Sequence, residues 1–343
     1  MRLLILTQAV DVEDLYLGFF HRWLLEFSKH FETIEVICLK EGKHALPSNV
    51  RVYSLGKERA PSRLRYIRLF YTYLWKLRGE YDAVLVHQNQ EYILLGGLLW
   101  RLLGKRVYLW RNHYAGTFLT GIAAGLSKKV FCTSRFSYTA RYRNNVLMPV
   151  GIDTAFFAAQ SGVARISRSI LFYARLAPSK KPDVFIAALA LLKGRGRDFS
   201  AVVRGTPLPE FALYLEELTA RVREKGLDSM IRFEPGAPND EGPRIFSTAD
   251  IFVNLGGSGM YDKMIFEAAA CGAIPLAMSK DFAAIADARL AFDGTAESLA
   301  ARLETILALS ESEKESLRAH ARSLAEDQSL ARLSARLVEE LSV

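Results

Sequence analysis

Residues 249–277 read ADIFVNLGGSGMYDKMIFEAAACGAIPLA and contain the clearest structural pattern of the chain. Ile251–Asn254 and Ile274–Ala277 are short apolar runs, which are typical of strands buried on both faces. Between them, Lys263–Cys271 has helical spacing and follows the glycine-rich loop Gly256–Gly259. Strand, helix and strand in this order predict part of a parallel sheet with a crossover helix.

The C-terminal half shows this alternation from its start. The other expected strands are Ile170–Tyr173, Ala201–Val203 and Ile231–Phe233, and the expected helices are Lys181–Leu192, Pro209–Lys225, Glu241–Ser247 and Lys263–Cys271. After Thr295 the pattern is helical, with a break expected near Asp327–Ser329.

The N-terminal half predicts a second parallel sheet. Its expected strands are Leu3–Thr7, Ile34–Leu39, Val50–Leu55, Ala83–His87, Val107–Trp110, Val130–Thr133 and Val146–Pro149, and its expected helices include Gly18–His30, Ser62–Arg78, Glu91–Leu103 and Ser134–Arg143. The fold class is therefore α/β, with two Rossmann-like, doubly wound domains. We expect both to bind ligands at the carboxyl ends of their strands, facing each other across a cleft. Ala158–Arg168 has no strong period and marks the expected boundary.

The net charge of +8 is shared unevenly between the two halves. Residues 1–155 contain 22 Lys and Arg against 12 Asp and Glu, a net charge of +10, whereas the remainder has 23 against 25, a net charge of −2. A basic half predicts an anionic partner, such as nucleic acid, a membrane surface or an acidic substrate. The sequence contains no recognised module for nucleic acid, so we expect no nucleic acid partner.

The cysteines and the apolar segments indicate a cytoplasmic protein. Cys38, Cys132 and Cys271 each lie in an apolar run without the spacing of a zinc site, so we expect buried thiols in a reducing cytosol. Polar residues end the apolar run at Met1–Leu6 too early for a signal peptide. Tyr92–Gly104 is too short for a membrane span and contains an arginine.

A basic pair follows the first strand of the C-terminal half, in the segment FYARLAPSKKP at 172–182. The guanidinium of Arg175 would offer a planar fork and the ammonium of Lys180 a point charge, beside the N-terminus of the next helix. This arrangement is typical of a diphosphate site. Solvated Arg and Lys after a strand are the common alternative.

The glycine loop at Gly256–Gly259 also leads into a helix, whose free N–H groups would face an anion. Glu267 lies one turn into this helix and is flanked by small and apolar residues. Its carboxylate could accept two hydrogen bonds from a ribose diol. A lone Glu on a helix is usually exposed to solvent, so the assignment depends on the two segments together.

Together these segments resemble the retaining glycosyltransferases of family 4, within the glycosyl transferases group 1, which have the GT-B fold. Their pattern is Gly-Arg-Leu, a Lys a few residues later, and then Glu-x7-Glu-Ala-x-Ala-x-Gly-x-Pro. Residues 174–180 (ARLAPSK) match the first part with alanine in place of glycine, and 267–275 (EAAACGAIP) match the second with the proline one residue late. The resemblance implies that Arg175 and Lys180 are catalytic and that Glu267 binds the donor.

Further segments extend the resemblance over nearly the whole chain. They are VVRG at 202–205, FEPG at 233–236, VGIDTAFF at 150–157, LGFFHRW at 17–23, HQNQEY at 87–92 and RNH at 111–113. The resemblance places Gly18, Gly205 and Gly236 at the donor, His87, Asn89 and Glu91 on the acceptor side, and His113 as a catalytic residue facing the transferred sugar. For His87, a polar residue that closes a strand end is an equal alternative.

The resemblance also implies how the chain is divided. Residues 1–157 would form the acceptor domain and 158–326 the donor domain. Residues 327–343 would form a C-terminal helix that crosses back to pack on the N-terminal domain.

The sequence departs from the family at the first Glu of the Glu-x7-Glu pattern, where it has Gly259. In the family this carboxylate usually contacts the sugar or stabilises charge near it, so its loss puts the donor sugar and activity itself in doubt. Asp262 and Lys263 lie in the same loop. We expect them, with Met260, to replace part of this donor contact, Lys263 being near the sugar or phosphate.

The expected chemistry is departure of a nucleoside diphosphate, which leaves oxocarbenium character on the sugar and negative charge on the β-phosphate. Fixed cations and N–H dipoles facing that charge are the dominant catalytic contribution, and removing one contact commonly costs about 3–4 kcal/mol of barrier. No Asp-x-Asp motif stands at a strand end, so we expect no metal ion and no cofactor. The resemblance implies retention by front-face attack, with the leaving phosphate helping to deprotonate the acceptor hydroxyl.

Lys57–Arg78 contains seven basic residues, one acid and five aromatics. On a helix, one stripe would consist of Ile67, Phe70, Leu74 and Leu77, and another of Arg65, Arg68, Thr72 and Lys76. Such a helix suits peripheral association with the inner face of a membrane, or an anionic, lipid-linked acceptor. The alternative is an ordinary crossover helix with a solvated basic face.

The sequence therefore predicts a hexosyl- or related transferase that moves a sugar from a nucleotide-sugar donor to a glycan or lipid-linked acceptor in the synthesis of a surface polysaccharide or glycoconjugate. Two alternatives stay open. A nucleotide-sugar 2-epimerase shares the architecture but would need further acidic and His residues across the cleft. A nucleotide-sugar-binding or glycan-binding protein that lost catalysis with the first Glu is the other alternative.

Overall fold

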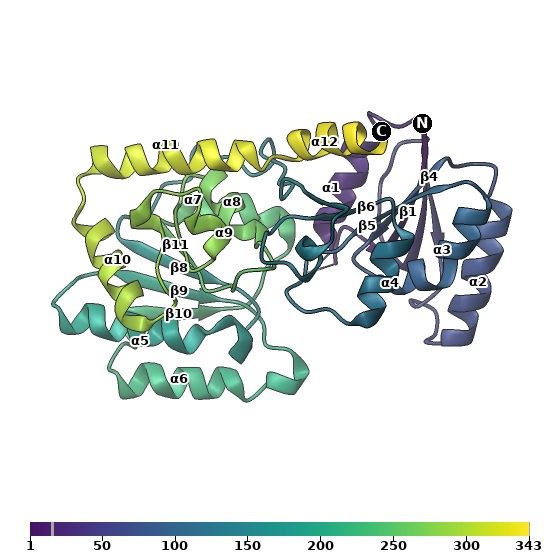
Figure 1. Ribbon diagram of the computed structural model, residues 1–343. Coiled ribbons are helices and arrows are strands. Elements are labelled where there is room, and N and C mark those ends of the chain that lie inside the picture. Colours follow the sequence, from purple (N-terminus) through teal and green to yellow (C-terminus); the bar gives the residue numbers. More distant parts are fainter. Residues whose placement is uncertain (15–16, 343) are drawn as a thin grey trace. The chain divides into compact units, whose positions relative to one another are not determined.

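The computed structural model describes residues 1–14 and 17–342, which form two α/β units (Figure 1). Unit 1 comprises Met1–Gly151 together with the segment from Leu330 onward, and unit 2 comprises Ile152–Ser329. The division near Gly151 falls a few residues before the boundary predicted from the sequence. Each unit is built around its own parallel sheet.

Within the described residues, unit 1 contains a seven-stranded parallel sheet in the order β3-β2-β1-β4-β5-β6-β7. The strands are β1 Arg2–Val10, β2 Thr33–Glu41, β3 Val50–Ser54, β4 Ala83–His87, β5 Arg106–Trp110, β6 Lys129–Cys132 and β7 Asn145–Leu147. All the strands predicted for this half are present. The order grows outward from β1 and β4 in both directions, which is the doubly wound arrangement.

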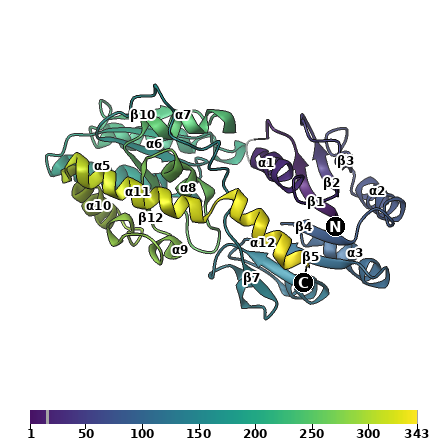
Figure 2. The ribbon, with the colours of Figure 1, turned by 90° about the horizontal axis from the view of Figure 1, so that it is seen from above.

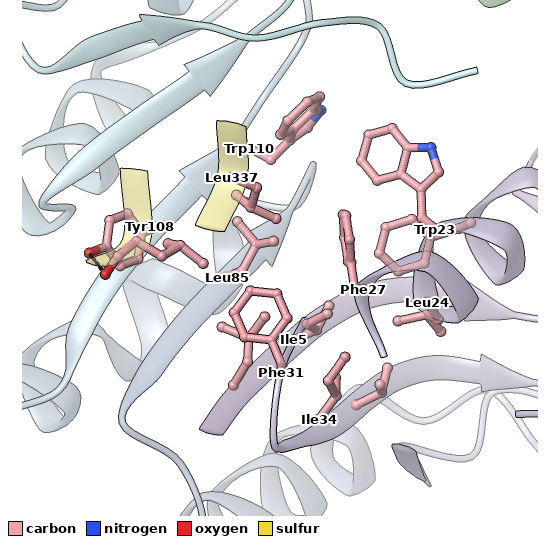
Figure 3. Close-up of a cluster of buried hydrophobic side chains, with 14 of the residues drawn as sticks. Ile5, Trp23, Leu24, Phe27, Phe31, Ile34, Leu85, Tyr108, Trp110 and Leu337 are labelled. Carbon is pink, nitrogen blue, oxygen red and sulfur yellow. Dashed lines mark hydrogen bonds between the residues drawn. The ribbon is translucent and has the colours of Figure 1, made fainter. Parts of the chain in front are cut away.

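Helices cover both faces of this sheet. The helices are α1 Gly18–Phe27, α2 Arg63–Lys76, α3 Glu91–Leu102, α4 Phe118–Leu126 and α12 Leu330–Ser342. Alternate residues of β1 point to opposite faces. Leu3 and Ile5 pack with α1 and α12, whereas Leu4 and Leu6 pack with α2, α3 and α4. Figure 3 shows the first of these cores, with Trp23 and Phe27 of α1 beside Leu85 of β4.

The C-terminal helix α12 belongs to unit 1, where it packs beside α1. Leu333, Leu337 and Leu341 are fully buried in the core under α1, and Figure 2 shows α12 lying beside β5. Lys129 at the start of β6 pairs with Glu340 at an N–O distance of 2.8 Å. The last turn of the chain is therefore fixed by apolar burial and by an ion pair.

Unit 2 contains a five-stranded parallel sheet in the order β10-β9-β8-β11-β12. The strands are β8 Ser169–Tyr173, β9 Ser200–Arg204, β10 Ile231–Glu234, β11 Ile251–Asn254 and β12 Ile274–Ala277. The helices are α5 Pro182–Gly194, α6 Tyr214–Glu224, α7 Gly242–Thr248, α8 Lys263–Ala270, α9 Lys280–Ala283, α10 Ala296–Ala308 and α11 Glu311–Asp327. The predicted strands are all present, and the predicted break near Asp327–Ser329 separates α11 from α12.

A buried ion-pair cluster fastens α11 to the amino end of β11. Asp250, which is 1% exposed, accepts hydrogen bonds from Lys314 at 3.0 Å and from Arg318 at 2.6 Å. These charged hydrogen bonds hold the pKa of Asp250 below its usual value, although burial acts in the opposite direction. The cluster lies at the opposite end of the strand from the loops described below, so it stabilises the unit rather than the site.

One predicted helix is wrong. Residues 134–143 form only a 3-10 turn at Tyr138–Arg141. Ser137 donates its hydroxyl to the carbonyl of His113 at 3.0 Å, and Thr139 donates to the carbonyl of Arg111 at 2.8 Å. Side-chain hydrogen bonds of Ser and Thr to the backbone compete with helix formation, and in this segment they replace the helix.

The apolar stripe predicted on α2 is also only partly buried. Phe70 and Leu74 are buried, and so is Leu77, which follows the helix, but Ile67 is exposed. Arg65 is not a solvated cation, because its guanidinium donates to the carbonyl oxygens of Gly56 and Ala60.

The three cysteines are free thiols in buried positions, as predicted. Burial raises the pKa of Cys38 and of Cys271 to about 12. Both thiols therefore remain protonated near neutral pH, which fits packing residues rather than nucleophiles.

Candidate donor and acceptor sites

The loops after the strands of unit 2 bring Lys180 and Asp262 together. Lys180 ends the 3-10 turn Pro178–Lys180 after β8, and Asp262 precedes α8. The Lys180 Nζ lies 3.7 Å from Asp262 Oδ2, which also accepts from Asn254 Nδ2 at 3.0 Å. The other oxygen of Asp262 caps α8 by accepting from the N–H of Met264 at 3.1 Å. Asp262 therefore holds Lys180 at the carboxyl edge of the sheet.

Arg175 lies exposed on the loop after β8. This loop is fixed against the end of β9, because the N–H of Ala174 donates to the carbonyl of Arg204 at 3.1 Å. A Cβ atom on Gly205 would lie only 1.8 Å from the carbonyl oxygen of Ala174. A glycine is therefore required at 205 for the two loops to approach, and this packing role is one that the sequence pattern alone did not identify.

Lys263 and Glu267 occupy successive turns of α8, four residues apart on the same side of the helix. Glu267 is 6% exposed, which is unusual for a helical carboxylate. Burial lowers the pKa of Lys263 to about 7, against the attraction of Glu267 and Asp262. The helix therefore places a Lys that can change its charge near neutral pH one turn from a buried acid.

Tyr173 and Arg204 complete this edge, and the sequence pattern did not indicate a site role for either. The Tyr173 hydroxyl donates to the carbonyl of Ala237 at 3.1 Å and accepts from its N–H at 3.0 Å. Arg204 lies over the Tyr173 ring and pairs with Glu234. Both residues end their strands, so their position directly before the loops is the signal that could have identified them.

The remaining predicted donor residues lie in loops of the same edge. Gly236 donates its N–H to the hydroxyl of Thr206 at 3.1 Å, joining the loops after β9 and β10. Gly259 is buried and has φ +94°, a left-handed conformation that favours glycine. A glutamate at 259 would be strained, so this loop differs in backbone as well as in side chain from a loop that has an acid there. The neighbouring Met260 is exposed.

In unit 1, the predicted acceptor residue His87 is a packed side chain at the end of β4. It is 2% exposed, stacks on Phe20 with ring centroids 4.4 Å apart, and also contacts the edge-on ring of Phe19 and the tilted ring of Trp23. Its Nδ1 lies 3.2 Å from the hydroxyl of Thr7 on β1. The structure places His87 beneath the surface of the sheet edge, where it supports neighbouring loops.

Asn89 and Glu91 lie nearer the surface. The carbonyl oxygen of the Asn89 side chain accepts from Gln8 Nε2 at 2.8 Å, which links the ends of β4 and β1. Glu91 is exposed in the first turn of α3. Gly18 begins α1 and is buried, and a Cβ there would lie 2.9 Å from the carbonyl oxygen of Val12.

His113 lies in the loop after β5. Its Nδ1 accepts a hydrogen bond from the N–H of Ala115 at 2.9 Å, and its ring stacks on Tyr114 with centroids 4.6 Å apart. The same Nδ1 lies 3.1 Å from the carbonyl oxygen of Ala115, so both backbone groups of Ala115 face this nitrogen. His113 is thus oriented by its loop.

No three His, Cys, Asp or Glu side chains in the described part of the chain are grouped so that they could hold a metal ion. Among residues 1–14 and 17–342, no helix is long and apolar enough to cross a membrane.

Comparison with solved structures establishes the class of fold. The Anabaena protein HepE in complex with UDP superposes with a TM-score of 0.79 at 18% identity, covering 100% of each chain. Sucrose-phosphate synthase from Thermosynechococcus elongatus gives a TM-score of 0.79 at 12% identity, covering 99% of this chain and 98% of that one. The two Rossmann-like units are those of the GT-B fold, as the sequence predicted.

Sequence comparison places the resemblance in unit 2. Residues 154–323 match the model of the family described as Glycosyl transferases group 1. The D-inositol 3-phosphate glycosyltransferase of Mycolicibacterium gilvum is 29% identical over 138 residues, 38% of this chain and 30% of that protein. The protein of the same name from Jonesia denitrificans is 33% identical over 114 residues, 32% of this chain and 27% of its own length. The matched segments thus span less than a third of these relatives.

Proposed function

We propose that this chain transfers a sugar from a nucleoside diphosphate sugar to a hydroxyl of a glycan or lipid-linked acceptor. The observation that supports this most is the set of side chains at the carboxyl edge of unit 2. Arg175 and Lys180 lie on the loop after β8, and Lys263 and Glu267 lie on α8 after β11. All four are within residues 154–323, which match the glycosyltransferase family.

In this proposal, Arg175 and Lys180 bind the diphosphate, and Glu267 accepts hydrogen bonds from the ribose. The ion pair with Asp262 keeps Lys180 in place before the substrate arrives, so little reorganisation is needed as negative charge develops. Lys263, with Asp262 and the exposed Met260, contacts the sugar or the β-phosphate. Gly259 leaves space in this loop for the sugar.

The proposed reaction breaks the bond between the sugar C1 and the β-phosphate oxygen and forms a bond between C1 and the acceptor oxygen on the same face. This attack on the face that the leaving group departs from gives retention of configuration, and the acceptor proton passes to the departing phosphate. In this proposal fixed cations neutralise the leaving group, and neither a metal ion nor a cofactor takes part. Gly205 and Gly236 allow the backbone to approach the nucleotide.

Unit 1 supplies the acceptor side in this proposal. His113 donates from Nε2 to the sugar or acceptor, and Asn89 and Glu91 contact acceptor hydroxyls. His87 acts by supporting these loops. The acceptor belongs to a surface polysaccharide or glycoconjugate, and the protein works in the cytoplasm, at the inner face of the membrane through residues 57–78.

The test is incubation of the protein with a panel of uridine, guanosine and adenosine diphosphate sugars. Release of nucleoside diphosphate in the presence of acceptor supports transfer. Isomerised donor would instead support the epimerase. The Arg175→Ala variant should lose both nucleotide binding and turnover. The matched control is Arg232→Ala, which changes another exposed arginine of the same unit. Unchanged turnover in Arg175→Ala would contradict the assignment of Arg175 to the diphosphate site.

One observation favours a second function. Position 259 is a glycine in a left-handed conformation, so the carboxylate that the resembled family has near the sugar is absent from this loop. A protein that binds nucleotide sugars without turning them over would keep Arg175, Lys180 and Glu267 and lose this acid. Saturable binding of a nucleotide sugar with no product from any acceptor would support that function.

A further inference from the structure

The outer sides of α2, α3 and α4 expose large apolar side chains. Leu64 on α2, Leu102 on α3 and Phe118 on α4 are 83%, 86% and 82% exposed. Trp75, Leu98 and Leu119 are exposed on the same three helices. We name these six side chains the outer helical face. Apolar groups in such numbers on one surface are unusual for a protein that meets only water.

The three helices lie in one layer of unit 1 (Figure 1). Gly96 of α3 faces α2, because a Cβ there would lie 3.1 Å from Phe70, and Gly97 faces α4, 3.0 Å from Leu126. The Tyr71 hydroxyl donates to the carbonyl of Leu95 at 2.9 Å, which joins α2 to α3. The inner sides of all three helices pack on the sheet, which leaves the outer sides without a partner among the described residues.

The charge around this face is strongly positive. The helices α2, α3 and α4 together contain five Lys and Arg and one acid, and neither α2 nor α4 contains an acid. Exposed Arg63, Arg68 and Lys76 lie on α2 among the apolar residues. The Arg78 guanidinium stacks over the Trp75 ring at 4.3 Å. Cations, aromatics and apolar side chains on one surface match the boundary between lipid headgroups and acyl chains.

We propose that the outer helical face docks on an anionic lipid bilayer, with its apolar side chains in the headgroup boundary and its cations on lipid phosphates. A second copy of this chain would bring the same cations face to face, which disfavours a dimer through this surface. The inference extends the membrane contact from residues 57–78 to α3 and α4. The inference rests on the proposed function in one respect, namely that the acceptor which this surface serves is lipid-linked.

The test is sedimentation of the protein with vesicles made of equal parts phosphatidylglycerol and phosphatidylcholine, and with vesicles of phosphatidylcholine alone. We expect binding to the anionic vesicles, weakened by high salt because screening shortens the range of the charges. Leu98→Gln combined with Leu102→Gln should lower the partition coefficient by about tenfold or more. Arg68→Gln combined with Lys76→Gln should lower it by about fivefold for each cation removed.

Matched controls lie in unit 2, where Leu213→Gln and Lys225→Gln change residues that are equally exposed. Both should leave vesicle binding unchanged. No binding to anionic vesicles, equal binding to both vesicles, or a dimer that the double Leu variant dissociates would overturn the proposal. Thermal shift with UDP separates the two proposals: the surface variants should keep the shift, whereas Arg175→Ala should lose it and still bind vesicles.

Discussion

At its carboxyl edge, unit 2 gathers charged side chains between β8 and β11, whereas unit 1 has neutral side chains between β1 and β4 and an ion pair of Asp11 and Lys40 between β1 and β2. In unit 2, Lys180 pairs with Asp262, and Lys263 lies one turn from the buried Glu267. In unit 1, the same kind of edge holds the amide pair of Gln8 and Asn89 and the ring of His87. Both edges result from parallel strands, so topology alone does not determine which ligand each one suits.

The two units also differ in where their cations lie. The sequence predicts an anionic partner for the basic half of the chain. Arg63, Arg68 and Lys76 are on the outer side of α2, which packs over one face of the sheet rather than at its carboxyl edge. In the two proposals, unit 2 uses Arg175 and Lys180 at a confined site, whereas unit 1 uses the cations of α2 over an extended surface.

Removing a cation from the edge of unit 2 should have the largest effect. Lys180→Ala should lower the rate of nucleoside diphosphate release by about 100-fold to 1,000-fold, because one fixed contact to the leaving phosphate is lost. Steady-state kinetics with a saturating acceptor measures this. Lys225→Ala, an exposed Lys of the same unit, is the control. A loss below about threefold for Lys180→Ala would break the assignment.

The next largest effect should come from the close approach of backbones. Gly205→Ala should lower the free energy of unfolding by about 3 kcal/mol, because its Cβ would overlap the carbonyl oxygen of Ala174. Gly18→Ala in unit 1 should cost less, since its Cβ would be 2.9 Å from the nearest oxygen. Urea denaturation measures both. Gly257→Ala, with no atom within 4 Å of the new Cβ, should change stability by less than about 0.5 kcal/mol.

The charge of Lys263 should make nucleotide binding depend on pH. The pKa of this Lys is lowered to about 7 by burial, and a bound diphosphate would raise it by attraction. Above pH 7 binding must then take up a proton, so the affinity for UDP should fall by about tenfold per pH unit until the pKa of the complex is reached. Titration calorimetry in buffers of different ionisation enthalpy measures this uptake.

The Lys263→Met variant supplies the comparison for that experiment. It should show a flat affinity above pH 7, and Lys225→Met should behave like the unmodified protein. The folded pKa lies below the ordinary value of 10.5, so the unfolded chain binds more protons between these values and stability should rise with pH there. An unchanged pH dependence in Lys263→Met would remove this residue from the donor site.

The smallest effect is expected at the amide pair between β1 and β4 of unit 1. Asn89→Ala should raise the KM for the acceptor by about fivefold, because one neutral hydrogen bond contributes about 1 kcal/mol. The affinity for UDP should stay the same. A loss of UDP binding in Asn89→Ala would show that the two edges do not divide donor and acceptor as proposed.

The strands were predictable because each is a short apolar run between polar or glycine residues, and β11 matches its predicted bounds. The absence of the helix expected at 134–143 could not be predicted. The hydrogen bonds that replace it reach from Ser137 and Thr139 to the distant backbone of 111–113. Of the proposed site, Arg175 and Lys180 followed from their place after a strand. The contact of Asp262 with Lys180 did not, because the two are far apart in the chain.

The sequence by itself determined the two parallel sheets, the cations after β8 and the acid on α8, because each of these is encoded within one strand, loop and helix. Only the tertiary structure decided that Glu267 is buried, that His87 lies under aromatic rings, and that glycine is required at 205. These properties depend on atoms supplied by distant segments. Burial, close approach and the pKa of Lys263 are set by what surrounds a residue, and a local pattern does not contain that information.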